Sequence, residues 1–222
     1  MAQFRPRYVT FDCYGTLTHF QMTALARERF SARIAADRLD AFVKDFSAYR
    51  FDEVLGAWKP YDEVIASALA RTCHRWGLAF DPDEARDYYE AVPSWGPHPD
   101  VPAPLAKVAE HYPLVILSNA SNNQIQANVD KLGAPFHAVF TAEQAQAYKP
   151  RFQAFEYMFD QLGCEPRELL HVSSSIRYDL MPAYDLGIEH KVYVNRGYDP
   201  STPYYGYHEM GNLAGLPGVL GL

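Results

Sequence analysis

The stretch YVTFDCYGTL, residues 8–17, predicts a short buried strand that ends on a carboxylate and a turn. Its first four residues are apolar or β-branched, and Asp12 follows them directly. Gly15 comes three positions later, where a tight turn would place a glycine. A single Asp after a strand usually forms a turn. The role of Asp12 can therefore be judged only from the residues that lie at the ends of the other strands.

Further strand-like runs alternate with helical segments in the second half of the chain. The strand candidates are residues 114–118, 138–142, 169–174 and 191–195. The helical segments between them end at glycines: Gly133, Gly163 and Gly187. Strands and helices in this order predict right-handed βαβ units, and therefore an α/β fold with a parallel sheet covered on both faces.

Residues 18–95 interrupt this alternation with long segments that have apolar residues at helical spacing. Residues 92–105 then contain five prolines and read as a stiff connection back to the sheet. We therefore predict an α/β core formed by residues 1–17 and 97–222, with residues 18–96 inserted as a helical cap. A cap in this place would close over the carboxyl edge of the sheet, where ligands of open α/β sheets bind.

The composition excludes several classes of function. A net charge of −7 gives no basic surface for nucleic acid, and no apolar stretch is long enough to cross a bilayer, so neither partner is expected. The N-terminal residues contain no long apolar segment before a cleavage site, so we expect no secretion signal. The three cysteines are widely spaced, which is typical of reduced thiols, and we predict a cytoplasmic protein.

Four polar features fall where parallel strands would end. Each has an ordinary explanation alone: a turn, a helix cap, a solvated lysine or a loop. Because the carboxyl ends of parallel strands meet at one edge, we expect the four to converge on a single crevice. They are Asp12 with Gly15 and Thr16; Ser118 with Asn119; Lys149 with Pro150; and Ser174 with Asp179.

In this order the motifs resemble those of the haloacid dehalogenase superfamily of hydrolases, and the resemblance covers nearly the whole chain. It rests on FDCYGTL (11–17), ILSNAS (116–121), YKP (148–150), HVSSSIRYDLMPAYDLG (171–187) and VNRG (194–197). The resemblance implies a Rossmann-like core with a helical cap. It also implies that the Asp12 carboxylate is a nucleophile, which forms a covalent intermediate that water then cleaves.

Two positions distinguish the reactions of this superfamily. Phosphatases normally carry a second aspartate two residues after the nucleophile, because an alkoxide leaving group needs a proton. Here that residue is Tyr14, which is not a comparable acid at neutral pH. Ser174 stands where phosphatases place an acidic residue that helps to hold Mg²⁺. Both departures favour the L-2-haloacid dehalogenases, which share the motifs and use no metal or other cofactor.

The resemblance implies a role for each motif residue. Asp12 would attack C2 of a 2-haloalkanoic acid and form an aspartyl ester, and Asp179 would activate the water that hydrolyses it to the 2-hydroxy acid. Thr16 would orient the nucleophile, and Lys149 would offset the charge of an anionic substrate, although Lys149 and Asp179 could instead be a structural ion pair. Further substrate contacts are predicted for Tyr14, Ser118, Asn119 and Ser174, and the resemblance suggests a homodimer.

Three pocket positions depart from the dehalogenase pattern. Phe42 aligns with the cap arginine that grips the halide, and Arg50 is the nearest arginine on its C-terminal side, so we predict that Arg50 binds substrate. Phe155 and Ile176 replace a tyrosine and an asparagine. The alternatives are therefore another small molecule with an activated carbon, a Mg²⁺-dependent phosphatase, or a non-catalytic binding protein. His171, within a buried-looking strand, is predicted to be structural.

Overall fold

The computed structural model describes residues 4–222; residues 1–3, part of the segment in which no secretion signal is expected, lie outside it. The described chain divides into two compact units. The core unit runs as far as His19 and resumes at Gly96–Leu222, and the cap unit is Phe20–Trp95.

A parallel sheet forms the centre of the core unit. Within residues 4–222 it has six strands in the order β3-β2-β1-β4-β5-β6, and every neighbouring pair is parallel. The predicted α/β fold class, with a parallel sheet and a helical insertion, is therefore confirmed. The strands are β1 (Tyr8–Phe11), β2 (Leu114–Ser118), β3 (Ala138–Thr141), β4 (Leu169–Ser173), β5 (His190–Val194) and β6 (His208–Met210).

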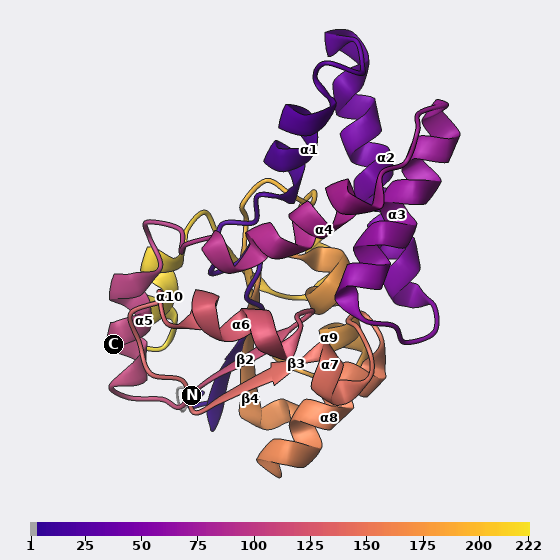
Figure 1. Ribbon diagram of the computed structural model, residues 1–222. Helices are drawn as coiled ribbons and strands as arrows, with labels where there is room; N and C mark the ends of the chain where they lie inside the picture. The colour runs from indigo at the N-terminus through magenta and orange to yellow at the C-terminus, as the bar shows by residue number, and fades with distance from the viewer. Residues whose placement is uncertain (1–3) are drawn as a thin grey trace. The chain divides into compact units, whose positions relative to one another are not determined.

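Successive side chains of a strand point to opposite faces of the sheet, so the strands contribute to two separate hydrophobic layers. One layer joins Val9, Ile116 and Val172 to the helices α5 (Pro102–Ala109), α6 (Asn122–Val129) and α10 (Leu216–Val219). The opposite layer joins Val115 and Leu117 to α8 (Phe152–Leu162) and α9 (Met181–Asp185). The sheet is thus covered by helices on both faces (Figure 1).

The strand order reverses beside β1. The chain adds β2 and β3 on one side of β1 and then returns to add β4, β5 and β6 on the other. β1 is therefore hydrogen-bonded to both β2 and β4, with Phe11 opposite Ile116 and Val172. Such a switch point opens a crevice outside the carboxyl ends of the strands, and the loops that follow β1, β2 and β4 begin there.

The cap unit is helical. Its four α-helices within the described residues are α1 (Met22–Phe30), α2 (Ala36–Leu55), α3 (Tyr61–Trp76) and α4 (Pro82–Ala91), followed by the 3₁₀ turn η1 (Val92–Ser94). Phe30, Phe42 and Phe46 are fully buried between these helices, and the Phe30 and Phe42 rings lie 4.3 Å apart. α3 ends at Gly77, whose left-handed conformation (φ 64°) closes the last turn.

The structure differs from the predicted elements in several places. α5 begins at Pro102, within residues 92–105, which were predicted to be a connection. The helix predicted to end at Gly133 ends at Val129 instead, and turn residues lead to the glycine. β6 was not predicted, because it is three residues long and mostly exposed, so it has no apolar pattern. No helix of residues 4–222 is both long enough and apolar enough to span a membrane.

Candidate active site

Asp12 leaves the end of β1 with its carboxylate held on both oxygens. Its backbone N–H donates to the Val172 carbonyl at 3.1 Å, which continues the β1–β4 pairing for one more residue. The Thr16 hydroxyl donates to Oδ2 at 2.7 Å, and Lys149 Nζ donates to Oδ1 at 2.9 Å. The residue is only 7% exposed, so the carboxylate has one defined orientation in a site that holds little water.

Lys149 connects the two predicted catalytic carboxylates. Its Nζ lies 2.9 Å from Asp12 Oδ1 and 2.7 Å from Asp179 Oδ1, and its third hydrogen bond goes to the Leu117 carbonyl at 2.8 Å. The side chain is 1% exposed, and the three acceptors use all three protons of the ammonium. One buried cation therefore neutralises part of the charge of two buried anions.

Asn119 holds the backbone that carries Lys149. Its amide nitrogen donates to the Lys149 carbonyl at 2.9 Å, and its oxygen accepts the Lys149 N–H at 2.7 Å. The role of Asn119 as a donor to substrate stays a prediction, and its two bonds to Lys149 add a proposed role in positioning the lysine loop. Ser118 differs, because its Oγ is buried without a hydrogen-bond partner in the described part of the chain. This hydroxyl can bond to a ligand.

Burial and the charge of Lys149 have opposite effects on the pKa values of Asp12 and Asp179. Burial raises the pKa of Asp12 above its usual range, with the Asp179 carboxylate adding to this effect and Lys149 opposing it. For Asp179 burial also acts to raise the pKa, but Lys149 and His171 outweigh it and hold the pKa below its usual range. The two carboxylates raise the pKa of Lys149 against the effect of its burial, so the ammonium stays charged.

Asp179 lies in a π-helical turn, η3 (Ile176–Leu180), that follows β4 and Ser174. Its side chain is fully buried, and Oδ1 accepts from both Lys149 Nζ and His171 Nε2. Oδ2 is buried and has no hydrogen-bond partner among residues 4–222. Because an unsatisfied buried oxygen is costly, this atom is suited to accept a proton or a hydrogen bond from a ligand.

Thr16 and Ser174 link the first and fourth motifs. The Ser174 N–H donates to Thr16 Oγ1 at 2.8 Å, and the two hydroxyl oxygens lie 3.1 Å apart. Gly15 precedes Thr16 with φ 94°, a conformation that glycine adopts most easily. The ring of Tyr198 covers it, so that a Cβ at this position would lie 3.3 Å from Tyr198 Cε2. The sequence analysis missed Tyr198, which lies in an irregular segment without a motif.

Tyr14 is hydrogen-bonded to a helix of the core unit. Its hydroxyl donates to Asn128 Oδ1 on α6 at 2.9 Å, and the ring packs beside the core as a half-buried side chain. The residue two positions after Asp12 is thus a phenol whose proton is already bonded to an amide oxygen. It does not supply the acid that an alkoxide leaving group needs.

A second group of polar residues donates hydrogen bonds to the backbone of the turn that follows Asp12. His98 Nε2 donates to the Gly15 carbonyl at 3.1 Å, and one guanidinium nitrogen of Arg196 donates to the Thr16 carbonyl at 3.1 Å. Arg196 is also paired with Asp100 at 2.8 Å. Burial lowers the pKa of His98 to about 4, with the charges of Arg196 and His19 adding to the effect. The imidazole is therefore neutral at neutral pH.

Arg50, the remaining predicted substrate-binding residue, lies in the cap unit on α2. It is 9% exposed, and its guanidinium lies 5.1 Å from the Phe46 ring centroid and 5.3 Å from that of Phe20. It hydrogen-bonds to Tyr61, while its Nε is buried without a hydrogen-bond partner in the described residues. The structure therefore gives the cap a buried cation with unused hydrogen-bonding capacity.

The donor set does not suit a magnesium ion, which the phosphatase alternative would require. Mg²⁺ takes carboxylate oxygens in a near-octahedral arrangement. Here Oδ1 of Asp12 and Oδ1 of Asp179 are both bonded to Lys149, and Tyr14 and Ser174 supply no carboxylate. Within residues 4–222 no three His, Cys, Asp or Glu side chains are grouped so that they could hold a metal ion.

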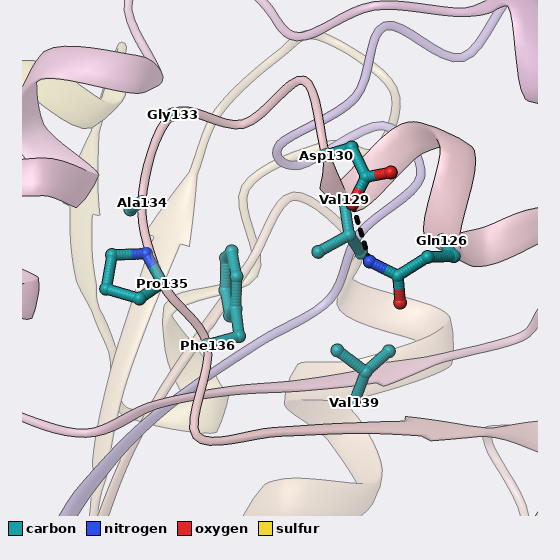
Figure 2. A pocket seen from close by; sticks show the side chains of 8 residues that line it. All are labelled: Gln126, Val129, Asp130, Gly133, Ala134, Pro135, Phe136 and Val139. Carbon is teal, nitrogen blue, oxygen red and sulfur yellow. Dashed lines mark hydrogen bonds between the residues drawn. The ribbon is translucent and has the colours of Figure 1, made fainter.

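A pocket of about 550 Å³ lies away from these residues. It is formed by the end of α6 and the loop that enters β3, so it lies at the amino edge of the sheet, opposite the edge that carries Asp12 (Figure 2). Its one side-chain hydrogen bond in Figure 2 joins Gln126 to Asp130 at 2.6 Å. The lining residues are Gln126, Val129, Asp130, Gly133, Ala134, Pro135, Phe136 and Val139. This pocket contains no catalytic constellation.

The fold and the buried Asp–Lys–Asp group define an α/β protein of the hydrolase class, with a carboxylate at the switch point of the sheet. The model of the haloacid dehalogenase-like hydrolase family matches residues 6–187. The chain belongs to this family, as its motifs predicted.

Curated relatives and solved structures agree with this assignment. An (S)-2-haloacid dehalogenase from Xanthobacter autotrophicus is 31% identical over 172 residues, covering 75% of this chain and 67% of that protein. (S)-2-haloacid dehalogenase 4A from Burkholderia cepacia is 28% identical, covering 95% and 93%. The structure of the L-2-haloacid dehalogenase from Xanthobacter autotrophicus with chloropropionic acid covalently bound superimposes with a TM-score of 0.78 at 23% identity, over 97% and 98% of the two chains. Membership of the family makes the protein a haloacid dehalogenase-like hydrolase.

Proposed function

We propose that this protein hydrolyses 2-haloalkanoic acids to 2-hydroxy acids through an aspartyl ester on Asp12. The observation that carries this proposal is the bond from Tyr14 to Asn128, because it leaves the nucleophile without a neighbouring acid. A halide departs as a weak base and needs no proton, whereas a phosphate ester departs as an alkoxide and does. The similarity to (S)-2-haloacid dehalogenases supports the same substrate class.

The first step is displacement at carbon. A carboxylate oxygen of Asp12 attacks C2, the new C–O bond forms, and the C–halogen bond breaks with its electron pair leaving on the halide. Thr16 and Lys149 fix the carboxylate for attack on the side opposite the halogen. The burial of Asp12 removes water that would otherwise solvate the nucleophile.

The second step is hydrolysis of the ester. Water attacks the Asp12 carboxyl carbon and gives one proton to Asp179 Oδ2, the buried oxygen that has no partner in the described residues. The bond from that carbon to the substrate oxygen then breaks, and the departing alkoxide takes the proton back from Asp179. Asp12 is left as a carboxylic acid and releases the remaining proton, so that one halide and one proton are produced for each water consumed.

An anionic substrate needs a positive charge that Lys149 cannot supply alone. Asp12, Asp179 and Lys149 together carry one net negative charge, because one ammonium is shared by two carboxylates. We therefore retain Arg50 as the proposed cation for the substrate carboxylate or the departing halide. Its Nε, which is buried and has no hydrogen-bond partner among residues 4–222, supports this role, and Ser118 Oγ is the proposed hydroxyl donor.

A parallel screen tests the proposed function. The purified protein is incubated with each enantiomer of 2-chloropropionate and with p-nitrophenyl phosphate, with and without EDTA, and chloride and phosphate release are measured. We expect chloride release that EDTA leaves unchanged and no phosphate release. Chelator-sensitive phosphate release without chloride would establish the phosphatase alternative, and turnover of neither class would favour a binding protein.

A further inference from the structure

His171 is a buried titratable residue that the proposed reaction does not yet use. It lies in the interior of β4 and is completely buried, and both of its ring nitrogens lie within hydrogen-bonding distance of a side chain. Nε2 is 3.1 Å from Asp179 Oδ1, and Nδ1 is 2.8 Å from Thr10 Oγ1. The prediction that this histidine is structural therefore needs to be extended, because it contacts a proposed catalytic carboxylate.

The contact makes the two oxygens of Asp179 unequal. Lys149 Nζ at 2.7 Å and His171 Nε2 at 3.1 Å both reach Oδ1. Oδ2 has no hydrogen-bond partner in the described chain. A carboxylate held by one donor can rotate about its last side-chain bond, whereas two donors from different elements fix the plane of the group. The oxygen that is left over is the one proposed to take the proton from water.

Thr10 contacts the other nitrogen of the imidazole. A carboxylate oxygen only accepts, so the proton between His171 and Asp179 belongs to His171 Nε2. Nδ1 lies 2.8 Å from Thr10 Oγ1, which also lies 3.4 Å from the Leu170 carbonyl oxygen. The register of the sheet brings this pair together, because Thr10 of β1 lies directly opposite His171 of β4.

The surroundings of His171 favour a fixed ring. Phe155 of α8, one of the three positions that depart from the dehalogenase pattern, packs edge-on against the imidazole at 5.7 Å. Lys191 is the register neighbour of His171 on β5, but its Nζ donates to the Ile188 carbonyl. The charged groups that face the ring are therefore Asp179 and, through the shared Oδ1, Lys149.

We propose that His171 is a positioning residue for hydrolysis of the aspartyl ester: it holds Asp179 with Oδ2 directed to the reacting centre, and Thr10 holds the opposite side of the imidazole ring. The proposal rests on the proposed function and assigns His171 to one half of that reaction. Attack by Asp12 depends on the hydrogen bonds that it receives from Thr16 and Lys149, whereas His171 bonds to Asp179 and Thr10. Loss of His171 therefore slows ester hydrolysis and spares ester formation.

The test separates the two half-reactions. Wild-type protein and the variants H171L, H171Q and T10V are mixed with 2-chloropropionate in a rapid-quench experiment, and chloride and the ester on the Asp12 peptide are followed by ion chromatography and mass spectrometry. In H171L we expect the first-turnover chloride release to stay within threefold of wild type. Steady-state turnover falls about 10- to 100-fold, and the ester accumulates.

The other variants distinguish positioning from packing. The Gln side chain of H171Q can still donate to Asp179, so we expect its turnover to be at least fivefold higher than that of H171L. In T10V we expect turnover to fall by a smaller factor than in H171L. T72V removes a buried hydroxyl in the cap unit, where Thr72 bonds only to its own helix, and serves as the matched control. Equal slowing of both half-reactions in H171L, or unchanged turnover in it, would overturn the proposal.

A spectroscopic measurement keeps the proposal independent of the substrate. If the wild-type protein releases no halide from any haloacid, the proposed function fails, and long-range ¹H–¹⁵N NMR of histidine-labelled protein then decides the His171 contact. We expect a proton on Nε2, where the Asp179 carboxylate accepts it, and a changed pattern in D179N. A proton on Nδ1 alone would contradict the assigned geometry, whatever the reaction.

Discussion

At the scale of single residues, the site depends on one lysine that serves two carboxylates. Lys149 contacts Asp12 and Asp179 at less than 3 Å, and all three side chains are buried. Two carboxylates this close to one another would otherwise raise each other's pKa and become protonated. The lysine thus opposes the rise in the pKa of Asp12 that burial causes, and it helps to hold the pKa of Asp179 below its usual range.

Replacing Lys149 tests this dependence. In K149M we expect kcat/KM for 2-chloropropionate to fall by about 10²- to 10³-fold or more, because the charged donor to the nucleophile is lost. The free energy of unfolding at neutral pH should fall by about 3–5 kcal/mol, since two buried charges lose their partner. K107M removes an exposed lysine of α5 and is the control. Retention of a tenth of wild-type turnover in K149M would contradict the assignment.

Replacing Gly15 tests how tightly the turn after β1 packs against Tyr198 and Ser174. In G15A the backbone must keep φ 94°, and the new Cβ meets Tyr198 Cε2 at 3.3 Å and Ser174 Oγ at 3.4 Å. We expect a loss of about 1–2 kcal/mol of stability from the backbone and a fall in activity of at least tenfold, as Thr16 is displaced. G187A has a similar backbone cost at φ 78° but no neighbour within 4 Å, and should keep its activity. Equal activity in both variants would contradict this account.

At the scale of elements, the sequence predicts those site residues that follow directly from strand ends. Asp12, Ser118 and the Ser174 loop begin where β1, β2 and β4 end, so a parallel sheet necessarily brings them to one edge. Lys149 is predicted only through its motif, because α7 (Ala142–Ala145) and a loop separate it from β3. The strands themselves are predicted well, because buried parallel strands are continuous apolar runs.

The residues that sequence reasoning missed are those placed by pairing or by irregular chain. His171 lies inside a strand, and only the register of β4 against β1 reveals its contact with Thr10. Tyr198 reaches Gly15 from a segment without periodicity, and β6 is too short and too exposed to leave a pattern. Asn119 was assigned to substrate because its motif was visible, whereas its bonds to the Lys149 backbone depend on the folded loop.

The turn that follows β1 gives a pH dependence of stability. His98 supports Gly15 and is 8% exposed, and burial lowers its pKa from 6.5 to about 4. The unfolded chain therefore binds a proton between these pH values and the folded chain does not. Stability from this group is complete above pH 6.5 and is lost as the pH falls toward 4, by at most roughly 3 kcal/mol.

Denaturant unfolding at a series of pH values measures this contribution. The free energy of unfolding of wild type relative to H98Q should fall by up to roughly 3 kcal/mol from pH 7 to pH 4, because glutamine does not titrate. H111Q removes an exposed histidine and should follow wild type throughout. A difference between wild type and H98Q that is constant with pH would show that His98 is not buried as a neutral ring.

At the scale of the whole molecule, the two compact units contain different charged groups. The core unit contains the proposed nucleophile and the proposed base, and their net charge with Lys149 is negative. The cap unit contains Arg50, a buried guanidinium among aromatic rings, in a chain whose net charge is −7. We therefore assign nucleophilic chemistry to the core and propose recognition of the substrate's charge for the cap.

Two substrates of similar shape, one charged and one neutral, test the proposed role of the cap. In R50M we expect KM for 2-chloropropionate to rise about tenfold or more, because a bond to a charged group is lost, and KM for the neutral 2-chloropropionamide to change less than threefold. R38M removes an exposed arginine of the same helix and should leave both values unchanged. A rise of equal size for both substrates in R50M would point to disturbed packing instead.

The covalent step on Asp12 is tested most directly by one single-turnover experiment in H₂¹⁸O. Enzyme in excess over 2-chloropropionate is quenched after one turnover and digested, and the peptides that contain Asp12 and Asp179 are weighed by mass spectrometry. We predict one ¹⁸O atom in the Asp12 carboxylate, none in Asp179, and an unlabelled hydroxyl group in the first product. A labelled product with an unlabelled Asp12 would show direct attack by water and would contradict the mechanism.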